Sequence, residues 1–361
     1  MDDARAWLAL TLVPGVPLGA QRRLLESFGS PAEVFKADPR SLEAIAGIAA
    51  AQALARGPVA SLVDRTLAWL QGPNRHLVTV GCEAYPSMLR NVHAAPIALY
   101  VEGRIEFLSA PSFAIVGSRN ATLVGMQDAE RIAQSLSDAG LTIVSGLALG
   151  IDGAAHRGGL AGASSTVAVM GTGPDIYYPR RNAKLAAEIA SRGCIVSEFP
   201  VGSPSAPGNF PRRNRLISGL SRGVLVVEAA LGSGSLITAK YALEQNRDVF
   251  ALPGSIHSTL SKGCHWLIKE GAKLVECADD ILGDLGIARK STDPSTEEQS
   301  SKRDPVLEAL GYAPISFDEF AVHSGLGAAT LAALLTKLEL EGRIEVLPGG
   351  RFQRARRGKI E

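Results

Sequence analysis

Long apolar runs are missing from this sequence. No stretch of 18 or more consecutive apolar residues occurs, which is the length that a membrane-spanning helix needs. The first ten residues, MDDARAWLAL, begin with acids, whereas a secretory signal begins with a basic stretch. Both absences favour a protein that works in the cytoplasm without a membrane partner.

Cysteine and excess charge are also scarce. The 4 cysteines, Cys82, Cys194, Cys264 and Cys277, lie far apart and form no CxxC pair, so we expect neither a disulfide framework nor a bound metal. The formal net charge is only +1. Near-neutral charge argues against a protein that coats nucleic acid by bulk electrostatics, so any anion site must be a local concentration of arginine and lysine.

Common nucleotide and hydrolase motifs are absent as well. The first glycine turn reads GSRNATLVG rather than GxGxxG, GTGPDI lacks the third glycine, and neither GxxxxGK[ST] nor GxSxG occurs. These absences argue against a dinucleotide site, a P-loop ATPase and a hydrolase nucleophile elbow. We therefore expect no cofactor.

The beginning of the chain predicts a small helical domain. Residues 1–75 are rich in Ala and Leu and are broken at Pro14-Gly15, Gly29-Ser30 and Gly47, which predicts several short helices. The segment PGVPLGAQRRLLESFGSP is typical of a SAM or helix-hairpin-helix domain, whose turn amides can hold a phosphate. A plain packing or protein-docking module is the alternative.

Residues 76–285 predict a Rossmann-like α/β domain with a mostly parallel sheet. The apolar runs are FAIVGS, LTIVSG, SSTVAVMG, CIVSEF, GVLVVEA, DVFALPG and AKLVE. Continuous hydrophobicity is typical of strands covered on both faces, and helices are expected between them, notably over 125–139, 182–191, 235–246 and 263–271. Such sheets bind ligands beyond the carboxyl ends of their strands, at the point where the strand order switches direction.

The end of the chain predicts a linker and a third domain. Residues 286–304 include RKSTDPSTEEQSSKRD, which is almost free of apolar side chains and predicts a flexible linker. Residues 305–361 then predict short helices, a strand, a Pro-Gly-Gly turn and a second strand, the layout of a winged helix. This domain could bind DNA, or it could serve as a dimer or partner module.

Small residues at the strand-to-helix turns predict an anion-binding groove. They let an anionic backbone approach the exposed N–H groups of the turns. Arginine or lysine accompanies several turns, and an arginine cluster with one phenylalanine follows CIVSEF in what we expect to be a long loop. Cations for phosphates and a ring for a base are what single-stranded nucleic acid needs. The candidate DNA-binding residues are Gly117, Ser118, Arg119, Ser145, Gly146, Arg180, Phe210, Arg212, Arg213, Arg215, Gly234, Ser235 and Lys240.

Each candidate also has a purely structural interpretation. Any single arginine could pair with Glu198 or Glu228, and Phe210 could plug its loop against the sheet. Asp152 and His156 are four residues apart and could form a general-base pair on one helix face. The stronger interpretation is that Asp152 caps the helix after GLALGID and that His156 is a hydrogen-bonded neighbour.

Taken in order and spacing, the motifs of the sheet domain resemble one bacterial family. GSRNAT, SGLALGIDGAAH, GTGPDIYYPRRN, SEFP, NFPRRNRLISGLS, VLVVEAALGSGSLITAKYALEQNRDVFALPG and KGCHWLIKEGA are similar to motifs of the DNA-processing protein A (DprA, also called Smf) family. The resemblance covers residues 113–282, and the flanking domains match the usual three-domain arrangement. It implies a dimer, without known catalysis, that binds incoming single-stranded DNA in natural transformation, shields it and loads the RecA recombinase.

Within this resemblance, the arginine of the GSR motif falls on Arg119, and the FPRRNR motif falls on Phe210, Arg212, Arg213 and Arg215. Two departures are visible. His265 stands where many relatives have Asn, and PVGSP lacks a lysine that some relatives carry, which shifts weight to Arg180 and Arg181.

Two other functions compete with this one. Related folds hydrolyse phosphoribosyl bonds with a glycine-rich loop followed by Thr and Glu, but LGSGSLITA has no glutamate at its helix start. A winged-helix transcription regulator would instead bind a specific duplex.

Overall fold

The computed structural model describes residues 2–287, 310, 314–341, 343–347 and 349–354. The chain forms two compact units, residues 1–290 and 291–361. Among the described residues, no helix is long and apolar enough to cross a membrane.

The first unit begins with a layer of short helices around their own apolar core. Gly29 and Gly47 end two of the helices with φ angles of 80° and 88°, which glycine adopts without a Cβ penalty. Ser30 and Asp38 each cap the next helix, and a proline follows in its first turn. The helices are α1 (Asp2–Thr11), α2 (Leu18–Phe28), α3 (Pro31–Lys36), α4 (Pro39–Ala46), α5 (Ile48–Arg56) and α6 (Ala60–Leu70).

The rest of this unit is built on a 9-stranded sheet in the order β1-β2-β6-β5-β4-β3-β7-β8-β9. All pairs are parallel except β1 with β2 and β2 with β6. The strands are β1 (Arg75–Thr79), β2 (Ala98–Gly103), β3 (Ser112–Val116), β4 (Thr142–Ser145), β5 (Thr166–Met170), β6 (Cys194–Ser197), β7 (Gly223–Val226), β8 (Asp248–Ala251) and β9 (Lys273–Leu274). The two antiparallel strands at one edge were not among the expected runs.

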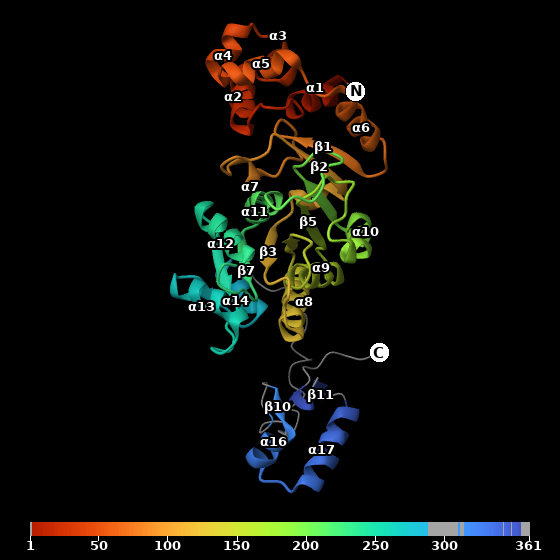
Figure 1. Ribbon diagram of the computed structural model, residues 1–361, viewed down its shortest axis with the longest axis vertical. Helices are drawn as coiled ribbons and strands as arrows, with labels where there is room; N and C mark the ends of the chain where they lie inside the picture. Colours follow the sequence, from red (N-terminus) through yellow and green to blue (C-terminus); the bar gives the residue numbers. More distant parts are fainter. Residues whose placement is uncertain (1, 288–309, 311–313, 342, 348, 355–361) are drawn as a thin grey trace. The chain divides into compact units, whose positions relative to one another are not determined.

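Helices cover both faces of the sheet (Figure 1). One face carries α7, α11, α12 and α13, and the other carries α8, α9 and α14, so alternate side chains of the central strands enter separate cores. The helices are α7 (Ser87–Arg90), α8 (Leu123–Asp138), α9 (Ile151–Ala161), α10 (Ala183–Arg192), α11 (Asn209–Leu220), α12 (Gly234–Glu244), α13 (Lys262–Lys269) and α14 (Ala278–Asp284). The Rossmann-like fold class is confirmed.

The strand order reverses beside β3. From β3 the chain runs outward through β4, β5 and β6, and it then returns to place β7 on the other side of β3. The connections after β3 and β7 therefore leave the sheet on opposite faces, which opens a crevice at their carboxyl ends.

The second unit has a winged-helix arrangement. It contains β10 (Ile315–Ser316), α16 (Phe317–Ser324), α17 (Ala328–Leu340), β11 (Ile344–Leu347) and β12 (Arg351–Arg354), with the strand order β10-β12-β11. Its core includes Phe320, Leu331 and Leu335. Most of the expected linker, from residue 288 onward, lies outside the described residues, so the proposed domain boundaries stay predictions.

Candidate functional site

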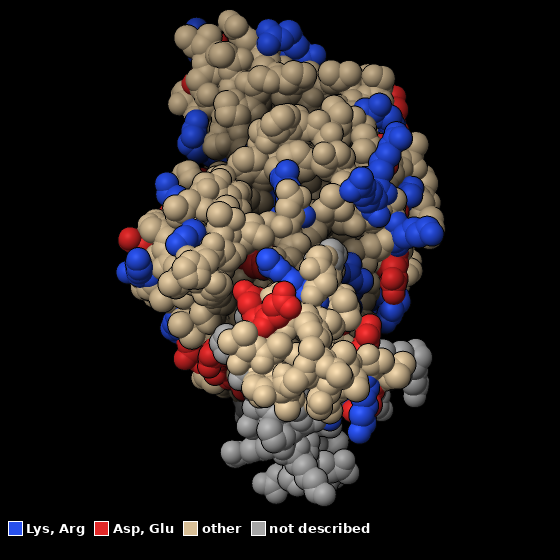
Figure 2. Space-filling view, turned by 60° about the horizontal axis from the view of Figure 1, so that its bottom comes forward, with Lys and Arg blue, Asp and Glu red and all other residues tan. Residues whose placement is uncertain are grey.

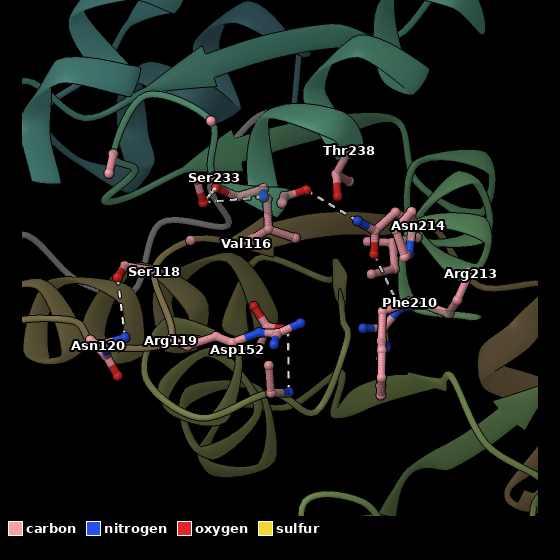
Figure 3. Close-up of a pocket in the computed structure, with 18 of the residues that line it drawn as sticks. Val116, Ser118, Arg119, Asn120, Asp152, Phe210, Arg213, Asn214, Ser233 and Thr238 are labelled. Carbon is pink, nitrogen blue, oxygen red and sulfur yellow. Dashed lines mark hydrogen bonds between the residues drawn. The ribbon is translucent and has the colours of Figure 1, made fainter. Parts of the chain in front are cut away.

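A pocket of about 500 Å³ lies at the carboxyl ends of β3 and β7, where the strand order switches (Figure 3). We call it the switch-point pocket. It is lined by Val116, Gly117, Ser118, Arg119, Asn120, Ala148, Asp152, Phe210, Pro211, Arg213, Asn214, Ile217, Ala230, Leu231, Gly232, Ser233, Gly234, Ser235 and Thr238.

The turn after β3 forms one side of this pocket. Gly117 has no room for a side chain, because a Cβ there would lie 2.6 Å from the Ile151 side chain. The Ser118 hydroxyl accepts a hydrogen bond from the Asn120 amide (3.2 Å), and the Ser118 carbonyl accepts one from the Ile151 amide (3.2 Å). The turn is thus fixed at both ends, and it presents the exposed Arg119 side chain at the rim of the pocket.

Phe210, near the start of α11, forms the opposite side. Its half-buried ring packs on Gly171, where a Cβ would come within 2.7 Å of a ring atom. The Tyr178 ring lies 5.5 Å away between centroids, and the Arg119 guanidinium carbon lies 5.6 Å from the Phe210 centroid. Phe210 therefore packs against the sheet and also lines the pocket, with a cation beside its ring.

The three clustered arginines lie on helix α11 and not in a loop, which corrects one expectation. Pro211 is compatible with the first turn of a helix, where no intrahelical N–H bond is lost. The helix therefore begins at Asn209, ahead of the arginines. The buried Leu216 and Ile217 anchor it to the sheet. A helix separates neighbouring residues onto different faces, and Arg212, Arg213 and Arg215 consequently have different surroundings.

Arg213 forms the inner wall of the pocket and is only 4% exposed. Its Nη1 donates to the carbonyl oxygens of Gly146 (2.6 Å) and Val169. A Cβ on residue 146 would lie 2.6 Å from the guanidinium, so glycine at this position makes room for the arginine. Burial lowers the pKa of Arg213 to about 10, which still leaves it charged at neutral pH.

Asp152 and His156 hold the connection between β4 and α9. The Asp152 carboxylate accepts from the amides of Gly146 (3.2 Å) and Ala148 (3.4 Å), which lie in that connection, so the expected cap of its own helix is not formed. Burial raises the pKa of Asp152, while Arg213 and these amides oppose the shift. The Nε2 of His156 accepts from the Leu147 amide (3.2 Å).

The other ring nitrogen of His156 fixes its protonation state. Its Nδ1 lies 2.7 Å from the Thr166 hydroxyl, and that hydroxyl donates to the Ile143 carbonyl (2.6 Å). Nδ1 must therefore carry the proton and donate it to Thr166, while Nε2 stays an acceptor. Burial lowers the pKa of this neutral imidazole to about 3.

Arg212 and Arg215 share one carboxylate on the other face of α11. Glu198 Oε2 lies 3.0 Å from Arg212 Nη2 and 2.5 Å from Arg215 Nη2. The Arg212 side chain is 54% exposed and the Arg215 side chain only 8%. The alternative pairing with Glu198 is thus present for these two residues, whereas Glu228 accepts from the Thr122 hydroxyl (2.6 Å).

The start of α12 forms the third side of the pocket. The Ser233 hydroxyl accepts from the Ser235 amide (3.4 Å), and the Asn214 side-chain amide donates to the Gly234 carbonyl (3.1 Å). No atom lies within 4 Å of a Cβ built on Gly234, so the backbone of this turn is open. Lys240 lines a different pocket, and its side chain is 78% exposed.

The structure brings only part of the expected set together. Seven candidates line the pocket: Gly117, Ser118, Arg119, Phe210, Arg213, Gly234 and Ser235. Ser145 and Gly146 lie behind it, where the buried Ser145 hydroxyl donates to the Ile115 carbonyl (2.6 Å). Arg180 is exposed in the short 3-10 turn Arg180–Asn182, and Arg212, Arg215 and Lys240 do not line this pocket. Their roles as DNA contacts stay predictions.

The sequence reasoning missed four residues at this site: Asn120, Tyr178, Asn214 and Thr238. Tyr178 and Asn214 lie inside the quoted motifs GTGPDIYYPRRN and NFPRRNRLISGLS. The motifs thus contained these residues, but the prediction selected the charged arginines beside them.

Basic side chains are spread over the face shown in Figure 2 and do not form one continuous surface. Several Lys and Arg side chains gather on the side where α10 lies in Figure 1, and acidic side chains are interspersed with basic ones elsewhere on this face. Anion binding would therefore depend on individually placed cations, as the net charge of +1 suggested.

Comparison with known proteins identifies this arrangement. The family model of DNA recombination-mediator protein A matches residues 76–286. The chain belongs to the DNA-processing protein A family. A model of the DprA winged helix domain matches residues 290–350, which assigns the second unit to the same family.

Individual DprA relatives support the same assignment. Protein Smf of Escherichia coli strain K12 is 42% identical over 305 residues, which cover 82% of this chain and 81% of the relative. The solved structure of DNA processing protein A from Streptococcus pneumoniae matches with a TM-score of 0.70 at 35% identity, over 78% of this chain and 97% of that one.

A second solved DprA structure bears on DNA binding. It comes from Helicobacter pylori and was solved in work on a single-stranded DNA binding mode. It matches with a TM-score of 0.53 at 31% identity, over 58% of this chain and 95% of that one.

Proposed function

We propose that this chain is a non-enzymatic recombination mediator that binds single-stranded DNA in the switch-point pocket. In the cytoplasm it protects DNA taken up in natural transformation and loads the RecA recombinase onto it. The observation that carries the proposal is the pair of Arg119 and Phe210, a cation beside an aromatic ring at the rim of a pocket with open turn amides.

This pair suits a single strand better than a duplex. An unpaired base can stack on the Phe210 ring, whereas the bases of a duplex are already stacked on one another. The Arg119 guanidinium beside the ring can contact the adjoining phosphate. The open turn at Gly234 and the amino end of α12 supply N–H groups that favour a second phosphate.

The buried polar residues in the wall of the pocket and behind it support a binding role over catalysis. His156 is neutral, and both of its ring nitrogens are engaged by Leu147 and Thr166. Asp152 accepts from two backbone amides. These residues shape the β4–α9 connection, and His156 has no ring nitrogen left for proton transfer.

Fluorescence anisotropy tests the proposal directly. Labelled poly-dT and a matched duplex are titrated with the protein at two salt concentrations, without added nucleotide. We expect preference for the single strand with a steep salt dependence. Phe210→Ala should weaken poly-dT binding by about 1–3 kcal/mol, because a stacked base loses its platform.

Arg119→Ala should also weaken poly-dT binding and lower the salt slope by about one. Arg131→Ala is the matched control, because Arg131 is an exposed arginine on α8 that does not line the pocket. If Phe210→Ala and Arg119→Ala bind poly-dT as tightly as the parent, the pocket is not the DNA site. Release of a nucleobase from nucleoside monophosphates would favour the phosphoribosyl hydrolase alternative instead.

We also propose that the protein works as a homodimer. Leu231, Ile237, Leu243 and Trp266 form an exposed apolar patch on α12, α13 and the loop before α12. Such patches commonly mark protein contacts. Lys240 and Glu270 border this patch, and in a two-fold pairing each could face its opposite charge on the second copy. Leu243→Arg should then shift the oligomeric state in analytical ultracentrifugation to monomer.

A further inference from the structure

Helix α11 separates the switch-point pocket from a second pocket of about 670 Å³. Arg213, Asn214 and Ile217 face the first pocket, while Arg212 and Arg215 face the second. We call this second hollow the arginine pocket. Its other walls come from the segment after α7, the carboxyl end of α12 and the turn that follows, through Asn91, His93, Tyr241, Glu244, Gln245 and Arg247.

Several polar atoms around the arginine pocket have no partner. Arg215 Nη1, Arg247 Nε and Gln245 Oε1 are buried, and within the described residues they accept or donate no hydrogen bond. The Arg215 side chain is only 8% exposed. Native proteins rarely leave buried polar groups unpaired, so each of these three atoms calls for a specific explanation. Arg212, Arg215 and Arg247 line the hollow, so a ligand there would meet their guanidinium groups rather than the enclosed atoms.

The charge balance of the arginine pocket is positive. Glu198 is shared by Arg212 and Arg215, so it neutralises one of two cations. Arg247 donates Nη2 to the Met88 carbonyl (3.3 Å) and forms no ion pair among residues 2–287. Glu244 and the carboxyl end of α12 oppose an anion, but three guanidinium groups outweigh them.

Guanidinium groups and this volume together indicate the ligand class. The planar donor fork of arginine matches phosphate oxygens, which can accept two parallel bonds. A pocket of about 670 Å³ is larger than inorganic phosphate needs and lies in the range of pockets that hold nucleotide-sized molecules. The Tyr241 ring lines the pocket and could contact a base.

We propose that the arginine pocket binds a phosphate-bearing nucleotide, namely a second nucleotide of the single strand held in the switch-point pocket. Rim residue Arg212, 54% exposed in the first turn of α11, lies where a strand would pass between the two pockets. This inference rests on the proposed function, because the strand must first occupy the switch-point pocket. The inference gives a role to the arginine residues that line only the arginine pocket.

Strand length separates the two pockets experimentally. Anisotropy titrations use two labelled strands. One is dT of about 6 residues, which fills only one pocket, and the other is dT of about 30 residues, which can reach both pockets. Arg247→Gln should leave the short strand unaffected, weaken the long strand at least about five-fold and lower its salt slope by about one. Arg119→Ala should weaken both lengths, and Arg131→Gln should change neither.

A second variant tests the same pocket without depending on whether Arg247→Gln folds correctly. His93 is exposed at the rim of the arginine pocket, so His93→Glu adds a carboxylate there without removing a buried contact. It should reproduce the selective loss of long-strand binding. Unchanged binding of the long strand by both variants would overturn the inference.

Thymidine 5′-monophosphate distinguishes a strand from a free nucleotide. If the mononucleotide raises the Tm of the parent but not of Arg247→Gln, and long-strand binding is unaffected, the pocket holds free nucleotide and the strand assignment is overturned. Failure of the proposed function has a different signature, in which Arg119→Ala and Phe210→Ala bind the short strand as the parent does.

Discussion

The rim and the inner wall of the switch-point pocket use arginine in opposite ways. Arg119 at the rim is exposed, with its guanidinium beside the Phe210 ring. Arg213 in the wall is 4% exposed and donates to the carbonyls of Gly146 and Val169. The rim arginine can exchange water for a ligand at little cost to the fold, whereas the wall arginine is part of the fold. Residue type alone therefore does not identify a ligand contact.

The largest expected effect on stability comes from replacing Arg213 in the wall. Arg213→Met should lower the free energy of unfolding by about 3–5 kcal/mol, because it removes the guanidinium donor to two buried carbonyl groups and the cation near Asp152. Chemical denaturation monitored by circular dichroism measures the change. Arg119→Met is the control and should stay within about 0.5 kcal/mol of the parent. Equal stability of the two variants would remove the distinction between rim and wall.

Two glycine substitutions test how tightly the Arg213 guanidinium is held in the wall. Gly146→Ala puts a Cβ 2.6 Å from the Arg213 guanidinium, which its hydrogen bonds prevent from moving away. We expect a loss of up to about 3 kcal/mol in the free energy of unfolding. Gly234→Ala is the matched control at the rim, since nothing lies within 4 Å of its Cβ. If thermal denaturation shows no difference between them, Arg213 is not held as tightly as its contacts indicate.

The pH dependence of stability tests the buried His156 behind the pocket. Its folded pKa of about 3 lies below the ordinary value of 6.5, so the unfolded chain takes up the proton first and stability falls as the pH drops below 6.5. The expected loss between pH 7 and pH 5 is about 2 kcal/mol.

Paired denaturation curves at pH 7 and pH 5 check this acid dependence. His156→Gln should show a pH dependence smaller by about 2 kcal/mol, while the exposed His257→Gln should keep that of the parent. An unchanged pH dependence in His156→Gln would mean that the buried imidazole can be protonated in the folded protein.

The difference between rim and wall also explains what the sequence could predict. Continuous apolar runs such as FAIVGS and SSTVAVMG predicted buried parallel strands, since local hydrophobicity determines them. The antiparallel strands β1 and β2 were missed. RHLVT of β1 begins with polar residues, whereas ALYV of β2 is a buried apolar run that the prediction overlooked. Gly146 was interpreted as a ligand-accessible turn. Its actual constraint is the guanidinium of a residue 67 positions later, which only the fold reveals.

Outside the switch-point pocket, Arg212 tests whether an exposed arginine can contribute to DNA binding with little effect on stability. Arg212→Ala removes a 54% exposed partner of Glu198, which Arg215 still neutralises, so the free energy of unfolding should fall by less than about 1 kcal/mol. Its binding of long dT strands should nonetheless weaken, with a salt slope lower by about one.

Arg215→Ala should lower the free energy of unfolding more than Arg212→Ala does, because the Arg215 side chain is 8% exposed and its loss leaves the buried Glu198 with only the exposed Arg212 as partner. Denaturation and anisotropy on the same two preparations compare both quantities. A large stability loss in Arg212→Ala, or a stable Arg215→Ala, would show that burial does not decide which arginine of this motif is needed for the fold.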